Sequence, residues 1–125
     1  IKINVTTLFT SEQIADFIDA VSSDVPSIIS IFAGRIADTG VDPMPTVADA
    51  VKLAAPKPLC EILWASTREL LNIFQAESVG CQVITVQNSI LAKRRDVGKD
   101  LFEYSLDTVR GFSKDAQALG FRILP

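Results

Sequence analysis

Four apolar stretches, each followed by a segment with helical spacing, constrain the fold of this chain more than any other feature. They lie at residues 1–9, 27–32, 60–65 and 82–86. Their Ile, Val and Leu residues are typical of strands that are covered on both faces. A helix between two such strands makes a right-handed crossover, and such crossovers produce a parallel sheet. The sequence therefore predicts an α/β fold built from four βα units.

Helix boundaries follow from capping residues, apolar periodicity and breakers. Leu70, Leu71 and Phe74 are expected to face the core from the third helix. A loop is predicted over residues 37–45, because Gly, Pro and Asp are concentrated there. Gly120 is expected to cap the last helix. The predicted helices cover about 11–20, 46–54, 68–77, 89–94 and 101–119.

Charge and residue usage exclude several kinds of function. The chain has 12 basic and 15 acidic residues, a net charge of −3, which gives no general attraction to nucleic acid or to an anionic membrane. A phosphate ligand would need local positive charge. The chain has no histidine, so the usual catalytic triads and most zinc sites are excluded, and no metal is predicted. No Gly-rich nucleotide loop is present, and no cofactor is predicted.

Location and completeness are predicted from simpler features. No apolar run of membrane length and no signal peptide is found. Cys60 and Cys81 match no metal or redox spacing, so we expect buried, reduced thiols in a cytoplasmic protein. The chain begins with Ile1 inside a predicted strand, and we expect it to be part of something longer.

Four βα units fit a small open sheet or half of an eightfold barrel, whose usual length is ~250 residues. Asn4 and Thr6 lie two apart and share a face of the first strand, and Ser30 is a polar residue in the second. Buried polar groups are costly without partners, whereas the carboxyl-terminal mouth of a barrel uses them to line a site. The half-barrel is therefore favoured.

Two strand ends offer groups that suit a phosphate ester. Ser66 and Arg68 follow the third strand where a helix begins, which would combine a hydroxyl, a guanidinium and helix N–H groups. The alternative is an N-capping Ser or Thr followed by a surface arginine. Arg35 ends the second strand and is a second anion ligand, unless it pairs with nearby Asp38.

Other residues near the strand ends allow two interpretations each. Thr6 could hold a water or a substrate hydroxyl, although Thr is also common in strands, and Thr7 is expected to point towards a helix. Phe32 and Trp64 could form an apolar wall beside a sugar, although such aromatic residues are more often core.

Several of these segments together resemble the transaldolase family. They are Asn4–Phe9, Ile29–Ile36, Trp64–Arg68, Gly80–Cys81 and Ile84–Val86, and their order and spacing agree across essentially the whole chain. The family is an (α/β)8 barrel of class I aldolases that moves a dihydroxyacetone unit between sugar phosphates through a Schiff base on a lysine. The resemblance implies that residues 1–125 are one domain, the C-terminal half of such a TIM barrel, with strands five to eight and a long C-terminal helix.

The resemblance also implies roles for individual residues. Thr6 would help to hold the catalytic water. The substrate-binding set would consist of Asn4 and Ser30 at the ketose, Phe32 lining the pocket, and Arg35, Ser66 and Arg68 at the phosphate.

One expected catalytic group is missing from this chain. The family's Schiff-base lysine is on the fourth strand of the barrel, and Lys2 lies at the wrong end of its strand to replace it. The resemblance implies a transaldolase of the pentose phosphate pathway whose nucleophile lies in an N-terminal half-barrel that this chain lacks, and self-association is the other way to cover the open sheet edges. A fructose-6-phosphate aldolase, in which water and not an aldose accepts the carbanion, and a non-catalytic sugar-phosphate-binding half-barrel remain open.

Overall fold

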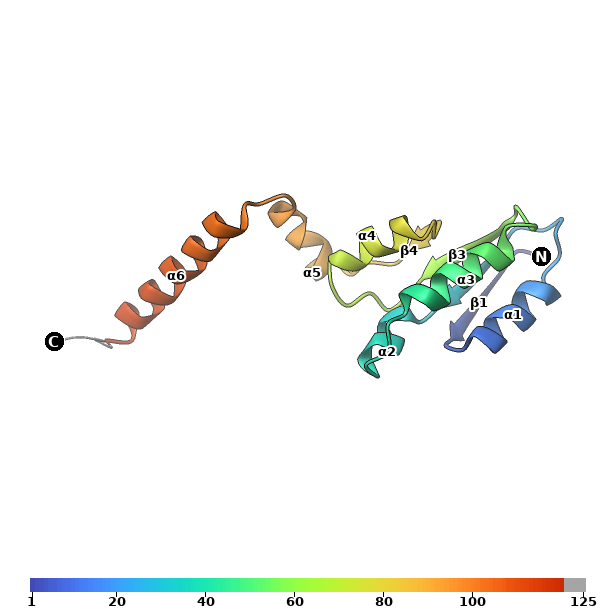
Figure 1. The fold of residues 1–125 in the computed structure, drawn as a ribbon, viewed down its shortest axis with the longest axis horizontal. Helices are drawn as coiled ribbons and strands as arrows, with labels where there is room; N and C mark the ends of the chain where they lie inside the picture. The colour runs from blue at the N-terminus through green and yellow to red at the C-terminus, as the bar shows by residue number, and fades with distance from the viewer. Residues whose placement is uncertain (121–125) are drawn as a thin grey trace. The chain divides into compact units, whose positions relative to one another are not determined.

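The computed structural model describes residues 1–120, which fall into two compact units, Ile1–Arg94 and a second that begins at Arg95 (Figure 1). The elements are β1 (Ile3–Leu8), α1 (Ser11–Ala20), β2 (Ser27–Ile31), α2 (Ala33–Asp38), α3 (Met44–Ala54), β3 (Cys60–Trp64), α4 (Leu71–Ser78), β4 (Val83–Ile84), α5 (Asn88–Leu91), η1 (Ala92–Asp96) and α6 (Leu101–Ala118).

The first unit is a four-stranded sheet in the order β1-β2-β3-β4, with every neighbouring pair parallel. The prediction of an α/β fold with a parallel sheet is therefore confirmed. The fourth strand is shorter than predicted. Its pairing with β3 is limited to Val83 and Ile84, and the Gln82 side chain takes the place of main chain by accepting a hydrogen bond from the Ile62 N–H at 2.9 Å.

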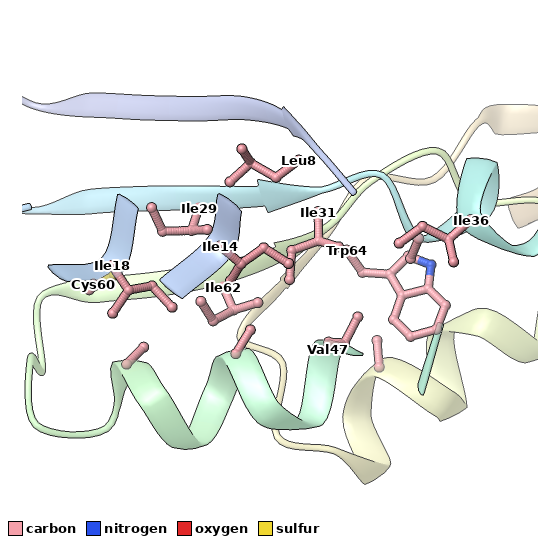
Figure 2. Close-up of a cluster of buried hydrophobic side chains, with 14 of the residues drawn as sticks. Leu8, Ile14, Ile18, Ile29, Ile31, Ile36, Val47, Cys60, Ile62 and Trp64 are labelled. Atoms are coloured by element: carbon pink, nitrogen blue, oxygen red, sulfur yellow. The ribbon is translucent and has the colours of Figure 1, made fainter. Parts of the chain in front are cut away.

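The core lies between one face of this sheet and the helices α1 and α3. Alternate strand residues, Ile29 and Ile31 on β2 and Ile62 and Trp64 on β3, are fully buried. Figure 2 shows them pointing towards Ile14 and Ile18 of α1 and Val47 of α3. Helices α1 and α3 also contact one another. Val47, Ala50 and Ala54 are the buried residues of α3 and form the face that packs on the sheet.

Helix α1 is fixed at both ends by side chains. At its start, Thr10 accepts a hydrogen bond from the Gln13 N–H, and the Gln13 side chain accepts one from the Thr10 N–H, both at 3.2 Å. This reciprocal pair is a capping box. At its end, Lys57 Nζ donates to the carbonyl oxygens of Ile18, Asp19 and Val21 at 2.7, 2.7 and 2.8 Å. One ammonium group therefore satisfies three carbonyls where the helix stops.

Lys57→Met is expected to lower the free energy of unfolding by about 1–3 kcal/mol, because three carbonyls, of which those of Ile18 and Val21 are partly buried, lose their charged donor. Denaturant titration followed by the fluorescence of Trp64, the chain's one tryptophan, measures this. Lys52→Met is the matched control, since the exposed Lys52 ammonium contacts only Asp49, at 3.3 Å, in an exposed ion pair of little value. Equal losses in the two variants would contradict the role given to Lys57.

Strand β1 is irregular around Thr6, the residue predicted to hold the catalytic water. The register with β2 shifts between Val5 and Leu8, and Thr7 has a left-handed φ of 67°. Leu8 consequently takes the buried position. The prediction that Thr7 points to a helix is wrong, because the bulge leaves Thr7 exposed and gives its place to Leu8.

Two helix predictions are corrected. Residues 37–45 are not entirely loop, because α2 extends to Asp38 and α3 already begins at Met44, with Pro45 in its first turn. Helix α4 begins at Leu71, later than predicted, and turns a different face inwards. Asn72 and Ala76 are its buried residues, whereas Leu71 and Phe74 are 55% and 46% exposed and Leu70 is half-buried ahead of the helix.

The second unit consists mainly of α6, which Asp100 caps by accepting hydrogen bonds from Phe102 N and Glu103 N at 3.0 Å. The C-cap residue is Leu119, one position before the predicted cap, and Gly120 follows it with a φ of 74°. Helical spacing would favour contacts of the apolar side chains of α6 with a core, but these side chains are exposed: Leu101, Tyr104, Val109 and Phe112. Within residues 1–120 no helix combines the length and apolarity needed to cross a bilayer.

Both cysteines are free thiols, as predicted. Cys60 is buried in the core, and Cys81 is half-buried with its Sγ 3.2 Å from the Ile62 carbonyl oxygen and 3.3 Å from that of Val83. Burial raises the pKa of the Cys81 thiol, which keeps it protonated and weakly reactive at neutral pH.

Candidate functional site

A very close approach of two backbone segments organises the carboxyl ends of β2 and β3. Gly34, in the first turn of α2, lies against the main chain of Ser66, and a Cβ on Gly34 would stand only 1.4 Å from the Ser66 carbonyl oxygen. Ser66 itself adopts a left-handed φ of 65°. The Gly34 N–H donates to the Ala65 carbonyl at 3.3 Å. Arg35 and Arg68, which follow these segments, are thereby brought into one region.

Arg68 forms a two-pronged ion pair with Asp38 at the end of α2. Its Nε donates to Asp38 Oδ1 at 3.0 Å, and its Nη2 donates to Oδ2 at 2.6 Å. This fork geometry is the arrangement in which guanidinium groups bind carboxylates and phosphates most specifically. Both side chains remain about half exposed, 43% for Arg68 and 51% for Asp38. The sequence-based alternative that Arg35 pairs with Asp38 is therefore wrong, since Arg68 takes both oxygens.

The charges at this point are coupled. Hydrogen bonding to Arg68, with added attraction from the charges of Arg68 and Arg35, holds the pKa of Asp38 below its ordinary value of 3.8. Hydrogen bonding to Asp38 in turn raises the pKa of Arg68. Asp38 is therefore ionised throughout the neutral range. Any stability from the pair is present above pH 3.8 and is lost as the pH falls through the depressed pKa of Asp38.

Arg35 lies on the same side of α2, three residues before Asp38. Its guanidinium carbon is 5.6 Å from the centroid of the Phe32 ring, a cation–π arrangement. Phe32 is half-buried and tilted against Phe9, with ring centroids 5.8 Å apart. Since Arg35 also helps to lower the pKa of Asp38, its positive charge belongs to the same cluster. We call Arg35, Asp38 and Arg68 the arginine cluster.

The backbone N–H groups that were predicted to bind phosphate, at the start of the helix after β3, already donate hydrogen bonds to a side chain. Asn72 Oδ1 accepts from the N–H groups of Arg68 and Glu69 at 2.9 and 3.1 Å. Asn72 is 8% exposed and donates through Nδ2 to Gln75. The prediction of free N–H donors at this point is wrong, because α4 starts three residues later and its own asparagine caps the intervening turn.

Ser66 and Thr67 lie beside a shallow hollow at the carboxyl ends of β3 and β4. The hollow, of about 200 Å³, is lined by Ser66, Thr67, Thr85, Val86 and Gln87. Thr67 is 4% exposed, and its Oγ1 donates to the Thr85 carbonyl at 2.6 Å. Thr67 therefore ties the two strand ends together, while Ser66 is the residue of the predicted phosphate set that lines this hollow.

On the sheet face opposite the core, Asn4 and Ser30 form a direct pair. Ser30 Oγ donates to Asn4 Oδ1 at 2.7 Å. The structure thus brings together the two residues that the resemblance places at a bound ketose. Thr6 is exposed two residues after Asn4, immediately before the bulge.

Trp64 does not belong to this surface. Its side chain is 0% exposed, and its indole Nε1 is buried without a hydrogen-bond partner in the described part of the chain. The expectation that Trp64 forms a wall beside a sugar is wrong, because it lies on the core-facing side of β3. Among residues 1–120, no group of three or more Cys, Asp or Glu side chains is arranged to hold a metal ion.

Sequence reasoning missed the roles of three residues that organise the site, Asp38, Gly34 and Asn72. Asp38 entered only as a competitor for Arg35, and Gly34 only as the residue before it. The short spacing from Arg35 to Asp38, on one face of a helix, was the signal available for Asp38. Nothing local in the sequence marked Asn72 as a cap, because a mid-helix Asn is ordinarily a weak helix former.

The first unit is thus an α/β unit with a parallel sheet, and Arg35 and Arg68 lie beyond the carboxyl ends of β2 and β3. Residues 1–123 match the sequence model of a family described as transaldolase/fructose-6-phosphate aldolase. The chain belongs to this transaldolase/fructose-6-phosphate aldolase family, as its segments at residues 4–9, 29–36 and 64–68 predicted, and the family indicates an aldolase or transaldolase type of enzyme. No curated protein matches the chain.

Proposed function

We propose that the protein is a transaldolase that transfers a dihydroxyacetone unit from a ketose phosphate of the fructose 6-phosphate type to an aldose phosphate. In this proposal it acts in the pentose phosphate pathway of the cytoplasm, and residues 1–125 supply the phosphate side of the site. Arg35, Ser66 and Arg68 bind the phosphate. The single observation that supports this assignment is the arginine cluster, in which residues from two successive βα units meet at one anionic group.

The arginine cluster contains one carboxylate, that of Asp38, and two guanidinium groups. Its formal net charge is therefore +1. The cluster therefore keeps a net positive charge in a chain whose overall charge is −3. Local positive charge of this kind is what a sugar phosphate requires, since phosphate oxygens bind guanidinium groups in pairs. Ser66 adds a hydroxyl at the edge of the neighbouring hollow.

Residues at the strand ends would bind the rest of the ketose. The Asn4–Ser30 pair offers an amide and a hydroxyl that can exchange their mutual hydrogen bond for bonds to substrate hydroxyls. Thr6 would hold the water that carries protons during Schiff-base formation and release, and the half-buried Phe32 would border the pocket. Thr6, Ser30 and Phe32 lie in or just beyond the carboxyl-terminal half of their strands, and the hydrogen bond from Ser30 brings Asn4 into the same group, which supports these roles.

The strand order supports a further part of the proposal. A parallel sheet whose spatial order equals its chain order is the arrangement of consecutive strands in a βα barrel. We place residues 1–125 as the last four of its eight units, with the Schiff-base lysine in an N-terminal half-barrel. That half, or a second copy of the chain, would cover the edges presented by β1 and β4.

A fructose-6-phosphate aldolase is the second candidate, and it is favoured by the family description, which names both activities. The two reactions share the ketose, the Schiff base and the phosphate site. They differ in whether an aldose or water accepts the carbanion. Adding an aldose phosphate such as erythrose 4-phosphate therefore separates them, because only a transaldolase accelerates donor consumption in response.

Borohydride trapping tests the proposed chemistry. The intact protein is incubated with fructose 6-phosphate, reduced, and digested for mass spectrometry. A dihydroxyacetone adduct is expected on one lysine outside residues 1–125, because a Schiff base is reduced to a stable secondary amine. An adduct on Lys52, Lys57 or any other lysine of this chain would refute the placement of the nucleophile. No adduct with any part of the protein would refute the Schiff-base mechanism.

A further inference from the structure

Among residues 1–120, Asp38 is the one acidic residue in direct contact with the proposed phosphate arginines, and its place there needs an explanation. A carboxylate beside a phosphate site repels the ligand. It is tolerated only if it contributes something that outweighs the repulsion. We propose that Asp38 is a positioning residue that holds the Arg68 guanidinium in the orientation in which it receives a substrate phosphate, an inference that rests on the proposed function.

The contacts show that Arg68 is held along its whole length. Its backbone N–H donates to Asn72. Its Cγ would be 3.1 Å from a Cβ on Gly34, so its aliphatic stem runs across the surface that Gly34 leaves open. Its Nε and Nη2 then donate to Asp38, which lies one helical turn after Gly34 on α2. Backbone, stem and head are each fixed by a different residue.

The ion pair still leaves donors for a ligand. A guanidinium carries five N–H groups in a planar fork. Asp38 takes the Nε–H and one Nη2–H, which are the pair on one edge of the plane. The other three N–H groups belong to Nη1 and Nη2. Two of them, one on each nitrogen, form a second fork that matches two phosphate oxygens. Asp38 and a phosphate can therefore be bound at the same time, on different edges.

The two opposing effects can be compared in size. An arginine that is free in solution loses rotamer freedom on binding, which weakens affinity by up to about thirtyfold. Asp38 removes most of that loss in advance. Repulsion between Asp38 and a phosphate across the guanidinium is partly screened at about 0.15 M salt and weakens affinity by a few-fold at most. The net effect of Asp38 is therefore expected to be tighter binding, by roughly fivefold.

The test uses inorganic phosphate as the probe and calorimetric titration of the intact protein at about 0.15 M salt. Asp38→Asn is expected to weaken phosphate binding roughly fivefold and to raise the KM for fructose 6-phosphate by a similar factor, with a much smaller change in kcat. Asp38→Glu retains a carboxylate on a longer arm and is expected to bind phosphate more tightly than Asp38→Asn. Asp107→Asn is the matched control, because Asp107 is likewise an exposed aspartate held in ion pairs, with Lys99 and Arg110, but on α6.

The outcomes separate this inference from the function on which it rests. In one outcome, the wild-type protein binds phosphate and Arg68→Ala weakens the binding, but Asp38→Asn leaves the binding unchanged or tightens it. Asp38 would then compete with the phosphate. The positioning role would be refuted, and the proposed function would stand. If the wild-type protein binds no phosphate, both proposals fail. An equal loss in Asp107→Asn would show a general charge effect and would also refute the role. Trp64 fluorescence and thermal melting establish that each variant is folded.

Discussion

Gly34→Ala is expected to destroy the contact between α2 and the end of β3, and with it most of the stability of the first unit. The added Cβ would stand 1.4 Å from the carbonyl oxygen and 2.6 Å from the carbonyl carbon of Ser66. Both are main-chain atoms that no rotamer change can move. Relief requires shifting a segment that carries buried Ala33, Ile36 and Ala65. The expected loss in free energy of unfolding is roughly 3 kcal/mol or more.

Gly111→Ala is the matched control for this substitution. Gly111 lies within α6 and a Cβ there meets nothing within 4 Å, so replacing it should stabilise the helix slightly, by less than ~1 kcal/mol. Urea titration followed by Trp64 fluorescence measures both variants. A Gly34→Ala protein as stable as the wild type would mean that α2 does not lie against Ser66, and the arginine cluster would lose its structural basis.

Arg68→Ala is expected to raise the KM for fructose 6-phosphate roughly ten- to hundredfold, because it removes a charge-assisted fork and leaves Asp38 facing the ligand alone. The effect on unphosphorylated fructose should be much smaller, since that substrate never made the contact. Steady-state kinetics with both donors measures the ratio.

Two further variants sharpen this result. Arg110→Ala removes an exposed arginine that is likewise paired with an aspartate, at 3.1 Å, and it should leave both KM values unchanged. Arg68→Lys keeps the charge and loses the fork, so an intermediate KM is expected. If Arg68→Ala impaired fructose and fructose 6-phosphate equally, Arg68 would serve the fold or the chemistry and not the phosphate.

Much of the fold could be predicted because it depends on local patterns. The apolar strands at residues 27–31 and 60–64 and the helix over residues 11–20 follow from periodicity and capping preferences alone. The family could be identified because its motifs are short, continuous segments that can be recognised directly in the sequence. The order and parallel direction of the strands then follow from the handedness of crossovers.

The remainder depends on contacts between distant residues. Whether Asp38 pairs with Arg35 or Arg68 is decided by the fit of Gly34 against Ser66, which no local pattern records. The buried face of α4 is likewise set by the site, because Asn72 turns inwards to cap Arg68 and Leu71 turns outwards as a consequence. The bulge at Thr7 leaves Thr7 exposed and places Leu8 in the core. Alternation of inward and outward residues along a strand does not predict where such a bulge occurs.

The strand order also has a consequence for biosynthesis. Each strand of the first unit pairs only with strands that are next to it in the sequence. A newly made strand can therefore join the sheet as soon as it leaves the ribosome, without waiting for a later segment to be inserted between earlier ones. Assembly can proceed from β1 towards β4 at the pace of translation, and the growing edge is always the one made last.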